Sequence, residues 1–178
     1  VLGFSMGGKC ALHLAQTMPQ KITALWLLAS DGIKTNKIYN VAVYPRWGRS
    51  LFKTTIQHPA WLFAVVNIAN KLRLLSPWLK KFTYNHMETK EKRERLYHTW
   101  ISMAAFNPDI NLVKKQINQH QIPVLLFFGK RDEVIPVAVG EFFAEGLSSC
   151  LLTRLERGHY FIDEKINPSL TAALQWLK

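Results

Sequence analysis

The sequence predicts an α/β fold with a mainly parallel sheet and an inserted helical segment. Short, nearly continuous apolar runs lie at 22–29 (ITALWLLA) and 124–128 (VLLFF), and such runs are typical of strands buried on both faces of a parallel sheet. Helical patterns alternate with these strands, which indicates right-handed crossover connections. The stretch between the two runs breaks the alternation, and it also carries the excess positive charge.

The elements around the insertion follow in order. Val1 and Leu2 are β-like, and residues 151–155 (LLTRL) predict a further strand nearer an edge of the sheet. Three helices are expected to flank the strands, each with a proline at its boundary. They are 8–18, which Pro19 ends; 137–147, which follows Pro136; and 169–177, which follows Asn167 as N-cap and Pro168 as the first helical residue.

The positive charge is confined to the middle of the chain. Residues 33–120 hold 15 Lys or Arg and 4 Asp or Glu, a net charge of +11, whereas acidic and basic residues balance elsewhere. Helical stretches at 58–75 and 89–103 occur there, without a convincing strand. We therefore predict an α/β core formed by residues 1–32 and 121–178, and a helical insertion at 33–120.

A serine stands between glycines at the start of the chain, in GFSMGG (3–8). This G-x-S-x-G pattern, placed between a strand and a helix, is typical of a nucleophile elbow that exposes Ser5 on a sharp turn. Side chains at Gly3 and Gly7 are expected to collide with the neighbouring strand and helix, and Gly8 to allow close helix packing. Met6 follows the serine and can offer its backbone N–H to an oxyanion.

A base and an acid for this serine follow later in the chain. Asp132 lies just after the 124–128 strand in GKRDEVIP, and His159 just after the 151–155 strand in RGHYF. The spacing between them leaves room for one helix and one strand, and the order serine, aspartate, histidine predicts a triad. Asp31, which follows the 22–29 strand, is the alternative position for the acid.

The fragments GFSMGG, FFGKRDEVIP and GHYF resemble the nucleophile, acid and histidine motifs of the α/β-hydrolase superfamily, in its cap-bearing branch. The resemblance covers about half of the chain, and the basic insertion matches that branch's helical cap in position and character. It implies a serine hydrolase that acts on a carboxylic ester or related acyl compound through an acyl-enzyme. Ser5, His159 and Asp132 would be catalytic and Met6 would be one oxyanion donor, with no metal and no organic cofactor.

The resemblance leaves other possibilities open. They include a C–C bond hydrolase, a lactonase, a thioesterase, and a non-catalytic member that binds a ligand or partner. Family members carry strands upstream of the elbow and a second oxyanion donor in that region. We therefore expect this sequence to be the C-terminal portion of a longer hydrolase, inactive by itself. No membrane span or signal-like start is visible, so a cytoplasmic location is expected.

The partner expected from the triad is a small-molecule acyl substrate. The basic clusters 80–81 and 90–95 could attract an anionic membrane surface, although a solvated helix face is the simpler interpretation. Nucleic-acid binding is not expected, because no recognition motif accompanies the charge. Tryptophans of the insertion are expected to lie in its core rather than in an acyl pocket; they are Trp47, Trp61, Trp78 and Trp100.

Overall fold

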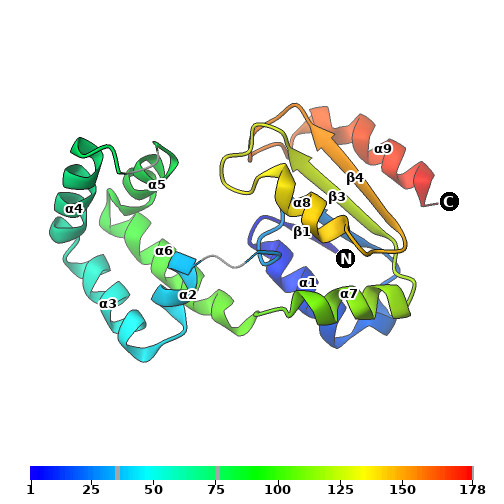
Figure 1. The fold of residues 1–178 in the computed structure, drawn as a ribbon, viewed down its shortest axis with the longest axis horizontal. Helices are drawn as coiled ribbons and strands as arrows, with labels where there is room; N and C mark the ends of the chain where they lie inside the picture. The colour runs from blue at the N-terminus through cyan, green and yellow to red at the C-terminus, as the bar shows by residue number, and fades with distance from the viewer. Residues whose placement is uncertain (35–36, 75–76, 178) are drawn as a thin grey trace. The chain divides into compact units, whose positions relative to one another are not determined.

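A computed structural model describes residues 1–34, 37–74 and 77–177. Contacts within the chain group into two compact units (Figure 1). Val1–Lys34 and Phe106–Lys178 form one unit, which contains the sheet, and Thr35–Ala105 forms the other, which is helical. The α/β class predicted from the sequence is confirmed.

The sheet has four parallel strands in the order β1-β2-β3-β4. The strands are β1 (Leu2–Phe4), β2 (Leu25–Leu28), β3 (Val124–Gly129) and β4 (Cys150–Leu155). In the register, Gly3 pairs with Leu27, and Leu27 pairs with Leu126. β2 is shorter than the predicted run 22–29, because the 3₁₀ turn η1 (Pro19–Lys21) still holds the N–H of Ile22 on the Pro19 carbonyl.

Helices cover both faces of the sheet (Figure 1). One face packs against α1 (Gly7–Thr17), α7 (Ile110–Gln119) and α8 (Val137–Ala144), and the other packs against α9 (Asn167–Trp176). Along β3 the side chains alternate between the faces: Leu126 and Phe128 join the first core, whereas Leu125 and Phe127 join the second. Burial on both sides explains why β3 reads as an unbroken apolar run.

The end of the insertion and the start of the last helix both differ from the sequence-based expectations. The expected insertion ended at residue 120 and so included α7, but Val113 and Ile117 of α7 are fully buried in the core beside the sheet. Asp109 begins α7, since its Oδ1 accepts the N–H groups of Asn111 and Leu112. At the other end, α9 includes Asn167 itself, one residue earlier than expected, after η3 (Glu164–Ile166).

The helical unit is built from five helices and a short 3₁₀ turn among the described residues. They are α2 (Lys37–Val43), α3 (Arg46–Gln57), α4 (Ala60–Lys71), α5 (Pro77–Met87), α6 (Lys90–Ser102) and η2 (Met103–Ala105). The half-buried Trp100 ring packs against other aromatic rings of this unit, 5.3 Å from the Tyr39 ring and 5.4 Å from the Phe52 ring, measured between centroids. Trp100 therefore packs as expected. No described helix is both long enough and apolar enough to cross a bilayer.

The other tryptophans of the insertion do not follow the expectation. Trp47 is 63% exposed and Trp61 is 44% exposed, so neither is a core residue. The side chain of Trp78 lies outside the described residues. The expectation for Trp47 and Trp61 failed because an amphipathic pattern cannot tell which of two apolar helix faces is buried.

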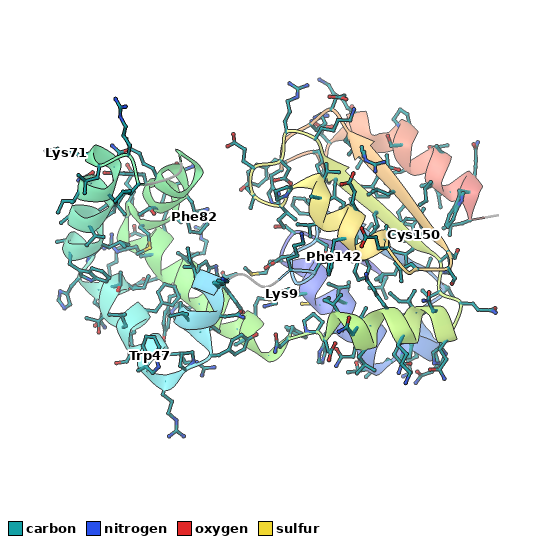
Figure 2. All side chains as sticks on the ribbon, in the orientation of Figure 1. Lys9, Trp47, Lys71, Phe82, Phe142 and Cys150 are labelled. Atoms are coloured by element: carbon teal, nitrogen blue, oxygen red, sulfur yellow. The ribbon has the colours of Figure 1, made fainter. Side chains whose placement is uncertain are left out.

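Two adjacent phenylalanines of α8 offer a matched test of the core. Phe143 is fully buried against the sheet, whereas its neighbour Phe142 is 41% exposed and lies beneath the Lys114 ammonium group (Figure 2). Phe143→Ala is expected to lower the free energy of unfolding by about 3–5 kcal/mol, because it leaves a cavity. Phe142→Ala is expected to cost about 1 kcal/mol. Urea denaturation measures both, and equal losses would contradict the assignment of Phe143 to the core.

Candidate active site

The turn after β1 holds Ser5 in the left-handed conformation, with φ of 48°. Non-glycine residues rarely adopt this region, and the cost must be met by surrounding contacts. The Ser5 N–H donates to the Leu28 carbonyl at 2.9 Å, and the Ser5 carbonyl accepts the N–H groups of Gly8 and Asp31, each at 2.9 Å. Ser5 is therefore anchored on both sides of its Cα, between the first helix and the end of β2.

The glycines of the turn have different roles. A Cβ on Gly3 would lie 2.7 Å from the Gly7 carbonyl oxygen, and a Cβ on Gly8 would lie 1.9 Å from Ser30 Oγ. Both positions require glycine, as expected. The expectation for Gly7 is wrong within the described residues, because a Cβ there meets no atom within 4 Å.

Ser5, His159 and Asp132 lie together in the structure. Ser5 Oγ is 3.0 Å from His159 Nε2, and His159 Nδ1 is 2.8 Å from Asp132 Oδ2. The side chain of Asp132 is fully buried and that of His159 is 8% exposed. The three residues follow β1, β3 and β4, and the carboxyl ends of parallel strands meet at one edge of a sheet. That topology brings together residues that are up to 154 positions apart.

Backbone groups hold the Asp132 carboxylate in place. Its Oδ1 accepts the N–H groups of Val134 and Ile135, each at 2.8 Å, which leaves Oδ2 for His159. Asp31, the alternative acid, has a different environment. Its Oδ1 accepts the N–H of Gly32 at 2.7 Å. The imidazole Nδ1 is thus paired with Asp132 and not with Asp31.

The loops that carry the acid and the histidine are joined to each other. The Lys130 N–H donates to the Leu155 carbonyl at 2.7 Å, and the Arg131 N–H donates to the Arg157 carbonyl at 2.9 Å. A Cβ on Gly129 would lie 2.4 Å from that same Arg157 oxygen. Arg157 also forms a two-pronged ion pair with Asp163, which closes the loop around His159.

The start of α1 offers backbone donors beside the serine. The first N–H groups of a helix have no partner within the helix. Here Gly8 and Lys9 use theirs in short turns to the carbonyls of Ser5 and Met6. Within the described part of the chain, the N–H groups of Met6 and Gly7 form no such backbone bond. Met6 thus lies where the sequence predicted a donor, directly after Ser5.

Two side chains near the site were not anticipated. The ring of Phe4 lies 5.4 Å from the imidazole of His159 and limits its movement on one side. Lys9, on the first turns of α1, is only 5% exposed (Figure 2). Burial lowers the pKa of the Lys9 amine, and the nearby charge of Asp31 opposes that shift. An aromatic residue in a strand and a lysine in a helix are too common for a sequence pattern to mark them.

Solved structures with a similar fold include several hydrolases. A hydrolase from Pseudomonas aeruginosa matches with a TM-score of 0.58 and 21% identity, over 99% of this chain and 63% of its own. The enol-lactonase from Burkholderia xenovorans matches with 0.55 and 15%, over 99% of this chain and 64% of its own. The 2-hydroxy-6-oxo-6-phenylhexa-2,4-dienoate hydrolase from Rhodococcus sp. matches with 0.55 and 18%, over 99% of this chain and 62% of its own.

The chain thus spans less than two thirds of the length of these solved structures. At these identities the likeness concerns the fold. No curated protein matches the sequence. A family model described as alpha/beta hydrolase fold matches residues 1–166, which is most of the chain. The chain therefore belongs to the alpha/beta hydrolase fold family.

Proposed function

We propose that the protein is a serine hydrolase that cleaves a carboxylic ester or related acyl compound through an acyl-enzyme on Ser5. The observation that carries this proposal is the hydrogen-bonded series from Ser5 Oγ through His159 to Asp132, with contacts of 3.0 Å and 2.8 Å. A protein that only binds a ligand has no need of a nucleophile, a base and a buried acid in this order. Fold alone would not support the same proposal.

In the first step His159 acts as general base. The Ser5 hydroxyl donates to Nε2 of His159, which takes the proton as Ser5 Oγ attacks the carbonyl carbon of the substrate. The carbonyl π bond opens and its electron pair moves to the oxygen. Asp132 accepts the Nδ1–H of His159 and stabilises the imidazolium that forms. The exclusion of water around the buried carboxylate strengthens this attraction.

The negative oxygen of the tetrahedral intermediate needs hydrogen-bond donors. We assign the Met6 N–H as one of them, because it lies at the start of α1, where the helix dipole also favours negative charge. As the intermediate collapses, the leaving alcohol takes the proton from His159 Nε2. A water molecule then gives a proton to His159 Nε2 as its oxygen attacks the acyl carbon on Ser5. The second tetrahedral intermediate collapses, the acid is released, and His159 returns the proton to Ser5 Oγ.

The chemical class of the substrate is left broad by the triad. Two of the structural neighbours are named as an enol-lactonase and a dienoate hydrolase, so lactones and C–C bonds beside a carbonyl are alternatives to simple esters. All of them begin with attack on a carbonyl carbon. We further propose that the helical unit, Thr35–Ala105, is the counterpart of the variable helical cap that sets the substrate in cap-bearing hydrolases.

A serine-directed probe tests the nucleophile. A fluorophosphonate is expected to label Ser5 of the intact protein, and peptide mapping identifies the modified residue. Ser5→Ala should abolish the labelling and lower kcat for a short-chain aryl ester by at least about 10⁴-fold, because no other group can form the acyl-enzyme. Thr17→Ala is the control, because it removes a hydroxyl of the same helix that donates to the His13 carbonyl. It should change neither the labelling nor kcat. Labelling at another serine would reject Ser5 as nucleophile.

The two aspartates at the sheet edge can be separated by matched substitutions. Asp132→Asn is expected to reduce kcat by about 10⁴-fold, because an amide cannot stabilise the imidazolium or hold the productive tautomer. Asp31→Asn should stay within about tenfold of the parent, since the Asp31 carboxylate accepts the neighbouring Gly32 N–H and does not pair with His159. Steady-state kinetics on one ester measures both. A larger loss for Asp31→Asn than for Asp132→Asn would overturn the assignment of the acid.

A further inference from the structure

Helix α4 exposes a line of apolar side chains. Trp61 is 44% exposed, Val65 53%, Ile68 59% and Leu72 62%. The spacing of four, three and four residues places all of them within about 60° of arc on one side of the helix. Single exposed apolar residues are ordinary, but a continuous line of large ones marks a contact surface. We call these four residues the α4 stripe.

The α4 stripe is not needed to hold the helix in its unit. The opposite side of α4 is the buried one: Val66 is 5% exposed, and the ring of Phe63 lies 5.4 Å from the ring of Tyr84 on α5. The Tyr84 hydroxyl also donates to Asn67 Oδ1 at 2.8 Å. Helix α4 is therefore apolar on two sides, whereas a surface helix with one core-facing side usually carries polar residues on the other.

The charge around the stripe has one sign. Residues 35–105 hold 12 Lys or Arg and 3 Asp or Glu, a net charge of +9, and all three acids lie within residues 88–94. Lys71 is exposed at the C-terminal end of α4 (Figure 2). Arg73, two residues after the helix, is also exposed, and neither side chain forms an ion pair among the described residues. The apolar surface is thus accompanied by positive charge that no carboxylate of α4 offsets.

The basic run 90–95 has a different environment. Lys90 pairs with Glu94 on α6, and Lys92 pairs with Glu88, which lies just before that helix. The Arg93 guanidinium donates to the backbone carbonyls of Ile56 and Met87. Much of this run therefore stabilises the unit itself, and α4 offers the better candidate for an external contact.

We propose that the α4 stripe, with Lys71 and Arg73, docks on the surface of an anionic lipid bilayer. A helix of 12 residues is about 18 Å long, too short to span a bilayer core of about 30 Å, so it would lie in the plane of the interface. Tryptophan favours that interface, and basic residues beside the apolar side attract anionic headgroups. A second copy of the chain is a poorer occupant, because it would bring two positively charged units together.

Co-sedimentation with vesicles tests the apolar part of the proposal. The intact protein is expected to sediment with vesicles of phosphatidylcholine and phosphatidylglycerol at low salt, and only weakly with phosphatidylcholine alone. The double variant Val65→Gln, Ile68→Gln should bind about tenfold more weakly, since two half-exposed apolar side chains no longer enter the interface. Leu174→Gln is the matched control, an apolar residue of α9 that is 52% exposed, and it should bind like the parent.

A second pair of variants tests the charge. Lys71→Gln with Arg73→Gln should weaken binding to the anionic vesicles and reduce its dependence on salt, because surface attractions are screened over about 8 Å at physiological ionic strength. Lys90→Gln with Lys92→Gln should have the smaller effect, since those ammonium groups are already paired. Equal effects would overturn the assignment of the charged contact to α4.

Controls separate this proposal from folding and from catalysis. The Val65→Gln, Ile68→Gln variant and the Lys71→Gln, Arg73→Gln variant should each melt within a few degrees of the parent, because the four substituted side chains are exposed. Ser5→Ala should bind vesicles like the parent, so a failed hydrolase assignment would leave vesicle binding intact. Parent-like binding by Val65→Gln, Ile68→Gln would overturn the proposal. Light scattering that shows a stripe-dependent dimer without vesicle binding would overturn it in favour of a second copy.

Discussion

The backbone bonds on either side of Ser5 are the constraint on which the arrangement of the site depends. The N–H of this residue is held by the Leu28 carbonyl and its own carbonyl by two N–H groups, so the turn can keep a conformation that a serine in a flexible loop would leave. The same turn brings α1 close to the sheet. The neighbouring atoms leave no room for a side chain at positions 3 and 8, so both positions require glycine. The serine hydroxyl then lies at the sheet edge where β3 and β4 also end and where the loops that follow them begin.

The fold of the sheet unit could be predicted because each of its elements leaves a pattern in a short, continuous stretch of sequence. Strands buried on both faces must be apolar throughout, so 124–128 was visible as a run of five such residues. The meeting of Ser5, Asp132 and His159 could be predicted for a topological reason. Parallel strands bring their carboxyl ends together, so a serine, an aspartate and a histidine that each follow a strand meet without any contact having to be guessed.

The features that sequence reasoning missed depend on packing between distant segments. Val113 and Ile117 have the same spacing as apolar residues in the helical unit, and nothing in that pattern says which core they join. Gly7 belongs to the motif, yet the space beside it depends on whatever lies against the turn. Periodicity also cannot tell which of the two apolar sides of α4 is buried. Trp61 was therefore expected in the core, although it lies on the exposed side.

The bonds between the loops after β3 and β4 determine how the site can move. Lys130 and Arg131 are tied to the chain on either side of Glu156, so the carboxylate and the imidazole are carried by one mechanically coupled piece. Ser5 belongs to another piece, built on β1, α1 and the end of β2. Thermal motion is therefore expected to vary the serine–imidazole distance more than the imidazole–carboxylate distance. Under the proposed mechanism, the stiffness of the connection between these two pieces would set how often Ser5 Oγ lies within hydrogen-bond distance of His159 Nε2.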